Sequence, residues 1–231
     1  REIIEYGGLF NFNLARLQGK VALPHITTAQ RPMTLAEKIL AKHSVVDLSS
    51  DQLGVPAVKP GDAGFVRTDI RFSHEYVTPM AAIFFEQLVG KDEKVNDPSS
   101  ILFFRDHLTF LAQVMPADRV KMGLLDLAGD LEKKQAAFAQ VQGIRLHGEM
   151  SDRPGSEGIC HSMVLENYAL PGQVIVGSDS HTPHSGAMGC LAFGIGTTDV
   201  FNAWITKDVR VKVPESVKVV VRGIKPANVT A

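Results

Sequence analysis

The feature that most constrains the fold of this chain is an alternation of short apolar runs with longer stretches of helical character. Ile101–Phe104, Ile144–His147 and Gln173–Gly177 are predicted strands, and the first is typical of a buried parallel strand. Ala117–Val141, an expected long amphipathic helix, and Gly158–Tyr168, an expected short helix, lie between them. Strands that alternate with helices predict an α/β fold built around a layered sheet.

Further elements are expected on both sides of this region. A capping box at Thr34–Glu37 predicts the start of a helix, and the spacing of Val77–Val89 predicts a buried one. The stretch between them from Val55 to Asp69 holds several prolines and glycines, so we expect a loop with short extended pieces. The glycine-rich stretch Gly186–Thr206 is expected to be a helix, and alternating valines predict a strand over Val211–Arg222.

The first residues suggest a division of the chain. Residues 1–17 are interpreted as a short helix, a break at Gly7 and Gly8, and an apolar tail, which is typical of the end of a preceding unit. Residues 18–32 show no periodicity and carry Pro24 and Pro32, as expected of an extended linker. The main folded region is therefore expected to begin at residue 33.

Composition excludes several classes of protein. A net charge of -1 over 231 residues provides no positive footprint for nucleic acid or for an anionic membrane surface. No apolar run approaches the roughly 20 residues that a membrane-spanning helix needs. The chain holds two cysteines, Cys160 and Cys190, at no metal-type spacing, so we expect buried thiols in a cytoplasmic protein. Neither cysteine is expected to hold a zinc ion or an iron–sulfur cluster alone.

Polar clusters follow two of the predicted strands, where open α/β sheets bind their ligands. Asp106 and His107 come after the run that ends at Phe104, and Asp179, Ser180 and His181 come after the run that ends at Gly177. A carboxylate beside a histidine raises the imidazole pKa and fixes its orientation. Such a pair suits general acid catalysis on a departing hydroxyl group.

Structural alternatives apply to each of these residues. A single Asp-His pair is more often a helix cap or a surface turn, and His161, taken alone, is more often a buried structural histidine. His147 at another predicted strand end is a weaker candidate. The glycines between residues 186 and 197 lack the endings of phosphate-binding loops and are better explained by close helix packing. The other histidines have no partner that the sequence indicates and are expected to be structural or at the surface: His25, His43, His74 and His184.

Three motifs together resemble the aconitase superfamily. They are Gly-Ile-Cys-His at Gly158–His161, the stretch Leu165–Gly172, and Gly-Ser-Asp-Ser-His-Thr-Pro at Gly177–Pro183. The glycine-rich continuation resembles 3-isopropylmalate dehydratase large subunits and homoaconitase. The resemblance covers residues 33–231 and implies a three-layer αβα fold, an aconitase-like first domain with part of the following one. It also implies that residues 1–17 are the tail of a swivel-like domain, joined by the linker 18–32.

The resemblance implies a hydro-lyase that moves water across a 2-hydroxy di- or tricarboxylate with the help of a [4Fe-4S] cluster. Asp106 and His107 match the family's acid pair, and His161 matches a second active-site histidine. Asp179, Ser180 and His181 match a catalytic and substrate-binding triplet. The cluster cysteines and the catalytic base are expected outside this chain, so it holds no cluster ligand and is expected to be inactive alone. Its expected partners are the remaining swivel and cluster-binding domains.

The sequence also bears on substrate specificity and leaves alternative functions open. Met80 stands where aconitases carry a substrate-contacting glutamine, which argues against ordinary citrate specificity. The alternatives are a non-catalytic or regulatory homologue, such as an RNA-binding apo form, and a cluster-free dehydratase of the same superfamily. The net charge disfavours nucleic-acid binding by this chain. The expected compartment is the cytoplasm, or the mitochondrial matrix in a eukaryote.

Overall fold

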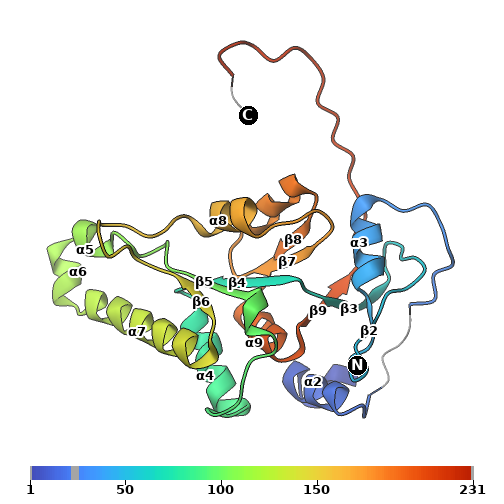
Figure 1. Cartoon of the computed structure of the whole chain (residues 1–231), viewed down its shortest axis with the longest axis horizontal. Coiled ribbons are helices and arrows are strands. Elements are labelled where there is room, and N and C mark those ends of the chain that lie inside the picture. The colour runs from blue at the N-terminus through green and yellow to red at the C-terminus, as the bar shows by residue number, and fades with distance from the viewer. Residues whose placement is uncertain (1, 22–25, 230–231) are drawn as a thin grey trace.

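The computed structural model describes residues 2–21 and 26–229, and its centre is a five-stranded parallel sheet (Figure 1). The strands lie in the order β6-β5-β4-β7-β8, and each neighbouring pair runs parallel. Their bounds are β4 Ile70–His74, β5 Ile101–Phe104, β6 Arg145–His147, β7 Val174–Gly177 and β8 Leu191–Gly194. Because the strands are parallel, their carboxyl ends meet at one edge of the sheet.

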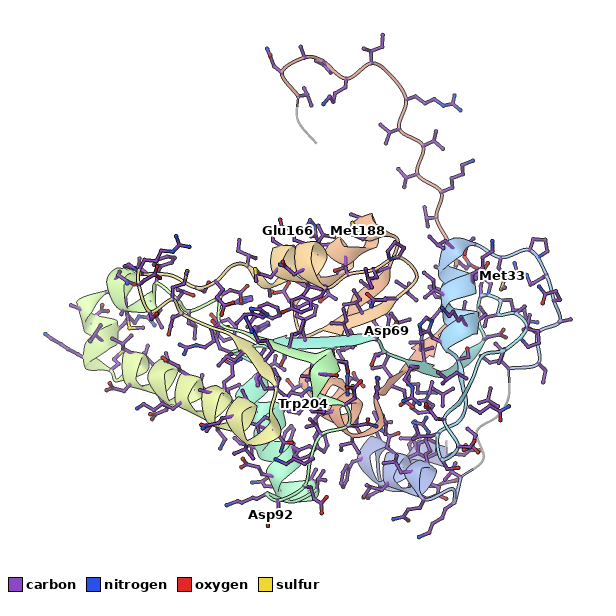
Figure 2. The ribbon with its side chains drawn as sticks, in the orientation of Figure 1. Met33, Asp69, Asp92, Glu166, Met188 and Trp204 are labelled. Atoms are coloured by element: carbon purple, nitrogen blue, oxygen red, sulfur yellow. The ribbon has the colours of Figure 1, made fainter. Side chains whose placement is uncertain are left out.

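Helices cover both faces of the sheet, and Figure 1 shows them as separate layers. One layer contains α4 (Thr78–Leu88), α7 (Leu124–Gln142) and α9 (Thr197–Thr206), and the other contains α8 (Cys160–Asn167). Side chains of β5 alternate between them. Ile101 and Phe103 pack with Trp204 of α9, which Figure 2 labels, whereas Leu102 and Phe104 join the cluster beneath α8. The expected α/β fold with three layers is confirmed.

Smaller elements surround this core. Strand β3 (Ala63–Arg67) pairs antiparallel with β9 (Asp208–Lys212), and β1 (Val45–Asp47) pairs antiparallel with β2 (Gln52–Leu53). The remaining helices are α1 Glu2–Glu5, α2 Leu9–Leu17, α3 Leu35–His43, α5 Leu111–Val114 and α6 Ala117–Lys121, with 3-10 helices η1 Pro98–Ser100 and η2 Thr182–Met188. The stretch expected to be loop between residues 55 and 69 contains β3.

Helix α3 begins as its sequence predicts. The Thr34 hydroxyl accepts a hydrogen bond from the Glu37 N–H at 3.3 Å, and the Glu37 carboxylate accepts one from the Thr34 N–H at 2.7 Å. This reciprocal pair satisfies two backbone groups that a helix start otherwise leaves without partners. The predicted helix over residues 77–89 is likewise confirmed as α4, with Pro79 in its first turn.

The amino-terminal segment packs on the main body through a buried ion pair. The apolar tail expected after Gly8 is the helix α2, and Asn13 on it donates to the Asn202 side chain on α9 at 2.9 Å. Arg16 donates to both carboxylate oxygens of Asp208, at 3.1 and 2.7 Å, with side chains 1% and 0% exposed. The linker that was expected over residues 18–32 includes Pro24 and His25, which lie outside the described residues.

Two predicted helices are broken by glycines in the left-handed region. The expected helix over residues 117–141 is wrong in its continuity, because Gly123 at φ 77° separates α6 from α7. The expected helix over residues 186–206 is also wrong. Gly189, at φ 78°, ends η2, after which the chain forms β8 and only then α9.

The strand predicted over residues 211–222 is much shorter than expected. Strand β9 ends at Lys212, and the following residues extend away from the body (Figure 1). The alternating Val217, Val219 and Val221 are 86%, 79% and 93% exposed. Alternation produces a strand only where a neighbouring strand pairs with it, and no described strand pairs with this segment.

Removing Asp208 is expected to destabilise the fold more than removing an exposed ion-pair partner. The substitution Asp208→Ala leaves the Arg16 guanidinium buried without its counter-ion, so the free energy of unfolding should fall by about 3–5 kcal/mol. Urea unfolding followed by fluorescence of Trp204, the chain's single tryptophan, measures the change. The control Asp130→Ala removes the partner of Lys133 from a pair 79% and 72% exposed and should change little. Equal losses in the two variants would contradict this account.

Candidate active site

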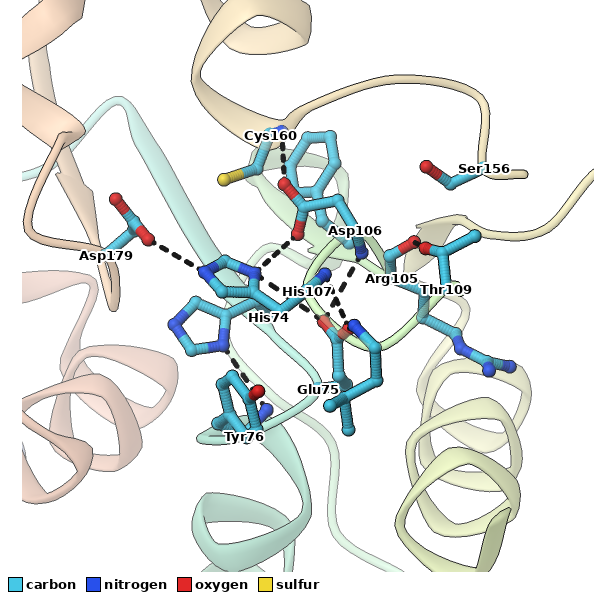
Figure 3. Close-up of polar contacts among 12 residues, drawn as sticks. His74, Glu75, Tyr76, Arg105, Asp106, His107, Thr109, Ser156, Cys160 and Asp179 are labelled. Carbon is cyan, nitrogen blue, oxygen red and sulfur yellow. Dashed lines mark hydrogen bonds and ion pairs between the residues drawn. The ribbon is translucent and has the colours of Figure 1, made fainter. Parts of the chain in front are cut away.

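The candidate site lies where β4, β5 and β7 end, and Figure 3 shows side chains that follow these strands, Glu75, His107 and Asp179, close to one another. Asp106 and His107 follow β5, and Asp179 follows β7. His161 lies in the first turn of α8, which packs over the same edge. The two polar clusters predicted at separate strand ends therefore come together, with β4 between them.

Asp179 lies at the centre of this site and contacts several of its histidines. Its side chain is 8% exposed and contacts three imidazoles: His107 Nε2 at 3.1 Å, His161 Nδ1 at 3.4 Å and His181 Nδ1 at 3.2 Å. The backbone N–H of His181 also donates to Asp179 Oδ1 at 2.6 Å. The desolvation that burial brings opposes ionisation of Asp179, but the His181 N–H and the surrounding imidazoles outweigh it and lower its pKa. Asp179 is therefore a carboxylate that holds several histidines in one place.

Asp106 fixes His107 from the opposite side. One carboxylate oxygen contacts His107 Nδ1 at 2.8 Å, and the other accepts the backbone N–H of Cys160 at 2.7 Å (Figure 3). The same aspartate therefore orients the imidazole and binds the start of α8, next to His161. This arrangement combines the functional and the capping interpretations of the Asp-His pair.

The surroundings shift the pKa values of His161 and His107 in opposite directions. Burial lowers the pKa of His161, and His181 and His184 nearby add to that effect. Burial acts in the same direction on His107, but the hydrogen bond and charge of Asp106 outweigh it. Glu75 and Asp179 add to the effect of Asp106, so the pKa of His107 is raised. Environments that separate the pKa values of neighbouring groups are typical of acid–base sites.

Glu75, which follows β4, is a site residue that the sequence did not indicate. It is 3% exposed, and one of its oxygens accepts the backbone N–H groups of His107 and Leu108 at 2.7 and 2.6 Å. Its other oxygen lies 3.4 Å from the Asp106 backbone nitrogen. A buried carboxylate with these donors holds the turn that carries Asp106 and His107. The signal in the sequence was its position directly after the strand, but that strand itself was not predicted.

His74, expected to be structural or at the surface, also lies in the site. Its ring centroid is 4.2 Å from that of His107, with 30° between the ring planes. His184 lies near the site as well, with its ring centroid 6.5 Å from that of His161. His43 is instead paired with Asp69, at 3.0 Å, just before β4 begins and so beyond the opposite end of that strand.

Glycines allow the turn after β7 to pack closely. A side chain at Gly177 would approach the Phe72 ring to 2.4 Å and the Thr182 hydroxyl to 2.5 Å. One at Gly194 would lie 2.9 Å from the Asp179 carbonyl oxygen. Close helix packing was the expected role of the glycines between residues 186 and 197, but Gly194 lies on strand β8 and packs against the Asp179 turn instead.

Three predicted residues, and Arg105, which was not predicted, lie at the edge of the site or outside it. Ser180 and His181 are exposed, and their side chains contact each other at 3.3 Å. Arg105 lies beside the acid pair in the sequence, but its guanidinium binds Glu132 and Glu149 at 2.5 and 2.7 Å. His147 contacts Glu157 and the Tyr168 hydroxyl at 2.7 and 2.6 Å, which explains it as a structural histidine.

The chain's own donors do not fit a [4Fe-4S] cluster. Such clusters need about three or four cysteine or histidine ligands, and this chain has two cysteines. Burial raises the pKa of the Cys160 thiol, and the nearby Asp106 carboxylate raises it further. Both effects oppose the thiolate form that a metal requires. Ligand atoms of Cys160, His161 and Asp179 lie within 4.8 Å of one another, as do those of His74, Glu75 and His107. In the second group the Glu75 oxygens already accept backbone N–H groups.

Of two cavities among the described residues, one lies away from this cluster and the other borders it at Glu75. One of about 470 Å³ is lined mainly by apolar side chains, including Phe12, Val45 and Phe65, and contains none of the predicted site residues. A second, of about 240 Å³, lies behind the acid pair and is lined by Glu75, Arg105 and residues of α5 and α7. Neither is lined by Asp179 or His107, so the candidate site rests on its side-chain geometry and not on cavity size.

Among the residues that the structure describes, no helix combines the length and the apolar character that crossing a bilayer demands.

Neutralising Asp106 is expected to lower the pKa of His107. In the unaltered protein His107 stays protonated to higher pH than an ordinary histidine, so its ion pairing stabilises the fold below the unfolded pKa. That stabilisation is lost as pH rises through the raised folded value. The substitution Asp106→Asn should move the His107 titration to lower pH, as measured by NMR of ¹⁵N-labelled histidine.

A remote pair provides the control for this titration. Burial lowers the pKa of His43, but Asp69 and the Ile39 carbonyl outweigh it and raise the value. The substitution Asp69→Asn should therefore shift His43 and leave His107 unchanged. A His107 titration that stays in place in Asp106→Asn would contradict the assigned electrostatics.

Comparison with known proteins gives the family. Residues 37–231 match the model of the aconitase family (aconitate hydratase). The chain is 35% identical over 192 residues to the 3-isopropylmalate dehydratase large subunit 1 of Pyrococcus furiosus, which covers 83% of this chain and 39% of the relative. It is 32% identical over 199 residues to the methanogen homoaconitase large subunit of Methanocaldococcus jannaschii, covering 86% of the chain and 40% of the relative.

A third relative is the chloroplastic 3-isopropylmalate dehydratase large subunit of Arabidopsis thaliana, 31% identical over 202 residues, which are 86% of this chain and 36% of the relative. The chain therefore spans about two fifths of the length of the curated relatives it matches. Two of the three motifs that carry the resemblance reach the candidate site: Gly177–Pro183 contains Asp179 at the end of β7, and Gly158–His161 contains His161 at the start of α8. This chain belongs to the aconitase family.

Proposed function

We propose that this chain supplies proton-transfer groups to a hydro-lyase that acts on a 2-hydroxy di- or tricarboxylate. The observation that carries the proposal is the position of His107 between two carboxylates, with Nδ1 at 2.8 Å from Asp106 and Nε2 at 3.1 Å from Asp179. This geometry, with the raised pKa of His107, supports a protonated imidazole at the site. Family membership supports the reaction class.

The reaction removes water from two neighbouring carbon atoms. It breaks the carbon–oxygen bond of one and a carbon–hydrogen bond of the other. His107 donates its Nε2 proton to the departing hydroxyl, which leaves as water, and Asp106 holds the ring and stabilises its charge. In the present arrangement that proton faces Asp179, so a bound hydroxyl replaces or shares this contact. A base removes the proton from the neighbouring carbon, which leaves the alkene.

His161, Ser180 and His181 have supporting roles in the proposal. The lowered pKa of His161 favours a neutral imidazole, which can both donate and accept a hydrogen bond. Ser180 and His181 are exposed on the turn after β7, as expected of groups that bind a substrate entering from solvent. Asp179 holds His161 and His181 in register with His107 and contacts the substrate hydroxyl.

The balance of charge supports a site completed by other parts of a longer protein. Asp106, Asp179 and Glu75 are carboxylates, and none of the interactions among the described residues brings a lysine or arginine to Asp179 or His107. A substrate with two or more carboxylates needs positive charge at its binding site. We therefore propose that cationic groups, the base and the cysteines of a [4Fe-4S] cluster come from outside this chain, and we assign the chain no cluster ligand.

The division of the chain belongs to the same proposal. Residues 1–17 represent the end of a swivel-like domain, 18–32 a linker, and 33–231 the aconitase-like catalytic region, which acts in the cytoplasm or the mitochondrial matrix.

Anaerobic assays of the full-length protein with citrate, homocitrate, 3-isopropylmalate and methylated malates identify the substrate. Absence of hydration or dehydration of all four, with a fully assembled cluster, would contradict the proposed reaction class.

Replacing His107 by asparagine in the full-length protein is expected to reduce kcat by about 10²- to 10⁴-fold while KM changes much less, because the lost proton transfer belongs to the transition state. Steady-state kinetics on the substrate found above measures both values. The matched control His43→Asn removes a histidine from a distant ion pair with Asp69 and should leave kcat of the folded protein unchanged. A near-normal kcat in His107→Asn would refute the acid role.

A further inference from the structure

His74 is held in one tautomer by the chain itself. The backbone N–H of Tyr76 donates to His74 Nδ1 at 3.2 Å. A backbone N–H can only donate, so Nδ1 must offer its lone pair. In a neutral imidazole the proton is then on Nε2, which makes that atom a hydrogen-bond donor.

The surroundings of His74 favour this neutral form. The residue is 6% exposed, its ring lies against that of His107, and its ring centroid is 5.5 Å from that of Tyr76 in a T-shaped arrangement. Burial lowers the pKa of His74, and the positive charge of His107 lowers it further. The carboxylates of Glu75, Asp179 and Asp106 act in the opposite direction but do not overcome these effects.

The Nε2 atom of His74 is available to a ligand. No hydrogen bond to it is formed by any residue that the structure describes. Figure 3 shows the His74 ring beneath that of His107, with Nδ1 toward Tyr76 and the other nitrogen turned to the side on which Asp179 lies. Although His74 is only 6% exposed, its Nε2 is not among the fully buried side-chain atoms that lack a partner in the described part of the chain, so a ligand or water can reach this atom.

We propose that His74 is a substrate-binding residue, a fixed neutral donor whose Nε2–H binds a carboxylate oxygen of the hydroxy acid. The inference rests on the proposed function for the class of ligand and deepens it by assigning a contact to the end of β4. His74 and His107 then divide two tasks between stacked rings. His107 transfers a proton, whereas His74 keeps its proton and positions the substrate beside it.

Two substitutions separate this role from a structural one. The asparagine in His74→Asn can accept the Tyr76 N–H in the manner of Nδ1 but does not reach as far as Nε2. The glutamine in His74→Gln carries its amide N–H near the position of Nε2 but does not reproduce Nδ1. Binding of 3-isopropylmalate, homocitrate and citrate to the full-length holoenzyme, measured by calorimetry, compares the two variants with the unaltered protein.

We expect His74→Asn to lose about 10- to 100-fold in affinity for the bound hydroxy acid, as for a hydrogen bond to a charged group, and His74→Gln to stay within about threefold. Normal binding by His74→Asn, equal losses in both variants, or no binding of any of the three acids to the unaltered protein would overturn the assignment. Binding with the expected pattern but without turnover refutes the proposed function and leaves the assignment standing.

A spectroscopic measurement tests the tautomer independently of catalysis. The signals of His74 in the ¹⁵N spectrum of histidine-labelled full-length protein are identified by their absence from the spectrum of His74→Gln. At neutral pH these signals should show that His74 is protonated on Nε2 alone. Protonation on Nδ1, or on both nitrogens, would overturn the assignment.

Discussion

The buried carboxylate of Asp179 is the interaction on which the site depends. It lies at the end of β7, where two glycines, Gly177 and Gly194, let the turn approach Phe72 and β8 more closely than any side chain would permit. There it accepts the His181 N–H and contacts imidazoles that come from three separate segments of the chain. A carboxylate so surrounded stays ionised, and it then determines where each ring lies.

Around this anchor the strand ends give the histidines different chemical properties. His107 has a carboxylate on each side, and its pKa is raised, whereas burial and neighbouring rings lower that of His161. One edge of a parallel sheet thereby holds a proton donor and neutral imidazoles within contact distance. The carboxylates outnumber the cations in this group, so an anionic substrate requires positive charge from beyond it. This balance is the physical reason for proposing a composite site.

Much of this arrangement was predictable from the sequence, and the exceptions have physical causes. The ends of β5 and β7 were predicted because uninterrupted apolar runs precede their Asp-His pairs. Strand β4, in the middle of the sheet, was not predicted because Arg71 interrupts it. The Arg71 guanidinium is buried and donates to the Ala203 and Asn96 carbonyls. A charged residue therefore interrupts the apolar pattern of a strand that lies in the interior. Missing β4 also meant missing the roles of His74 and Glu75.

The most direct test of the account is a structure of the full-length protein with its hydroxy-acid substrate bound. We predict that the departing hydroxyl oxygen lies within about 3.2 Å of His107 Nε2, a hydrogen-bond distance, on the side where Asp179 now contacts that atom. A substrate bound with its hydroxyl away from His107, or in the apolar cavity beside Phe12 and Phe65, would contradict it.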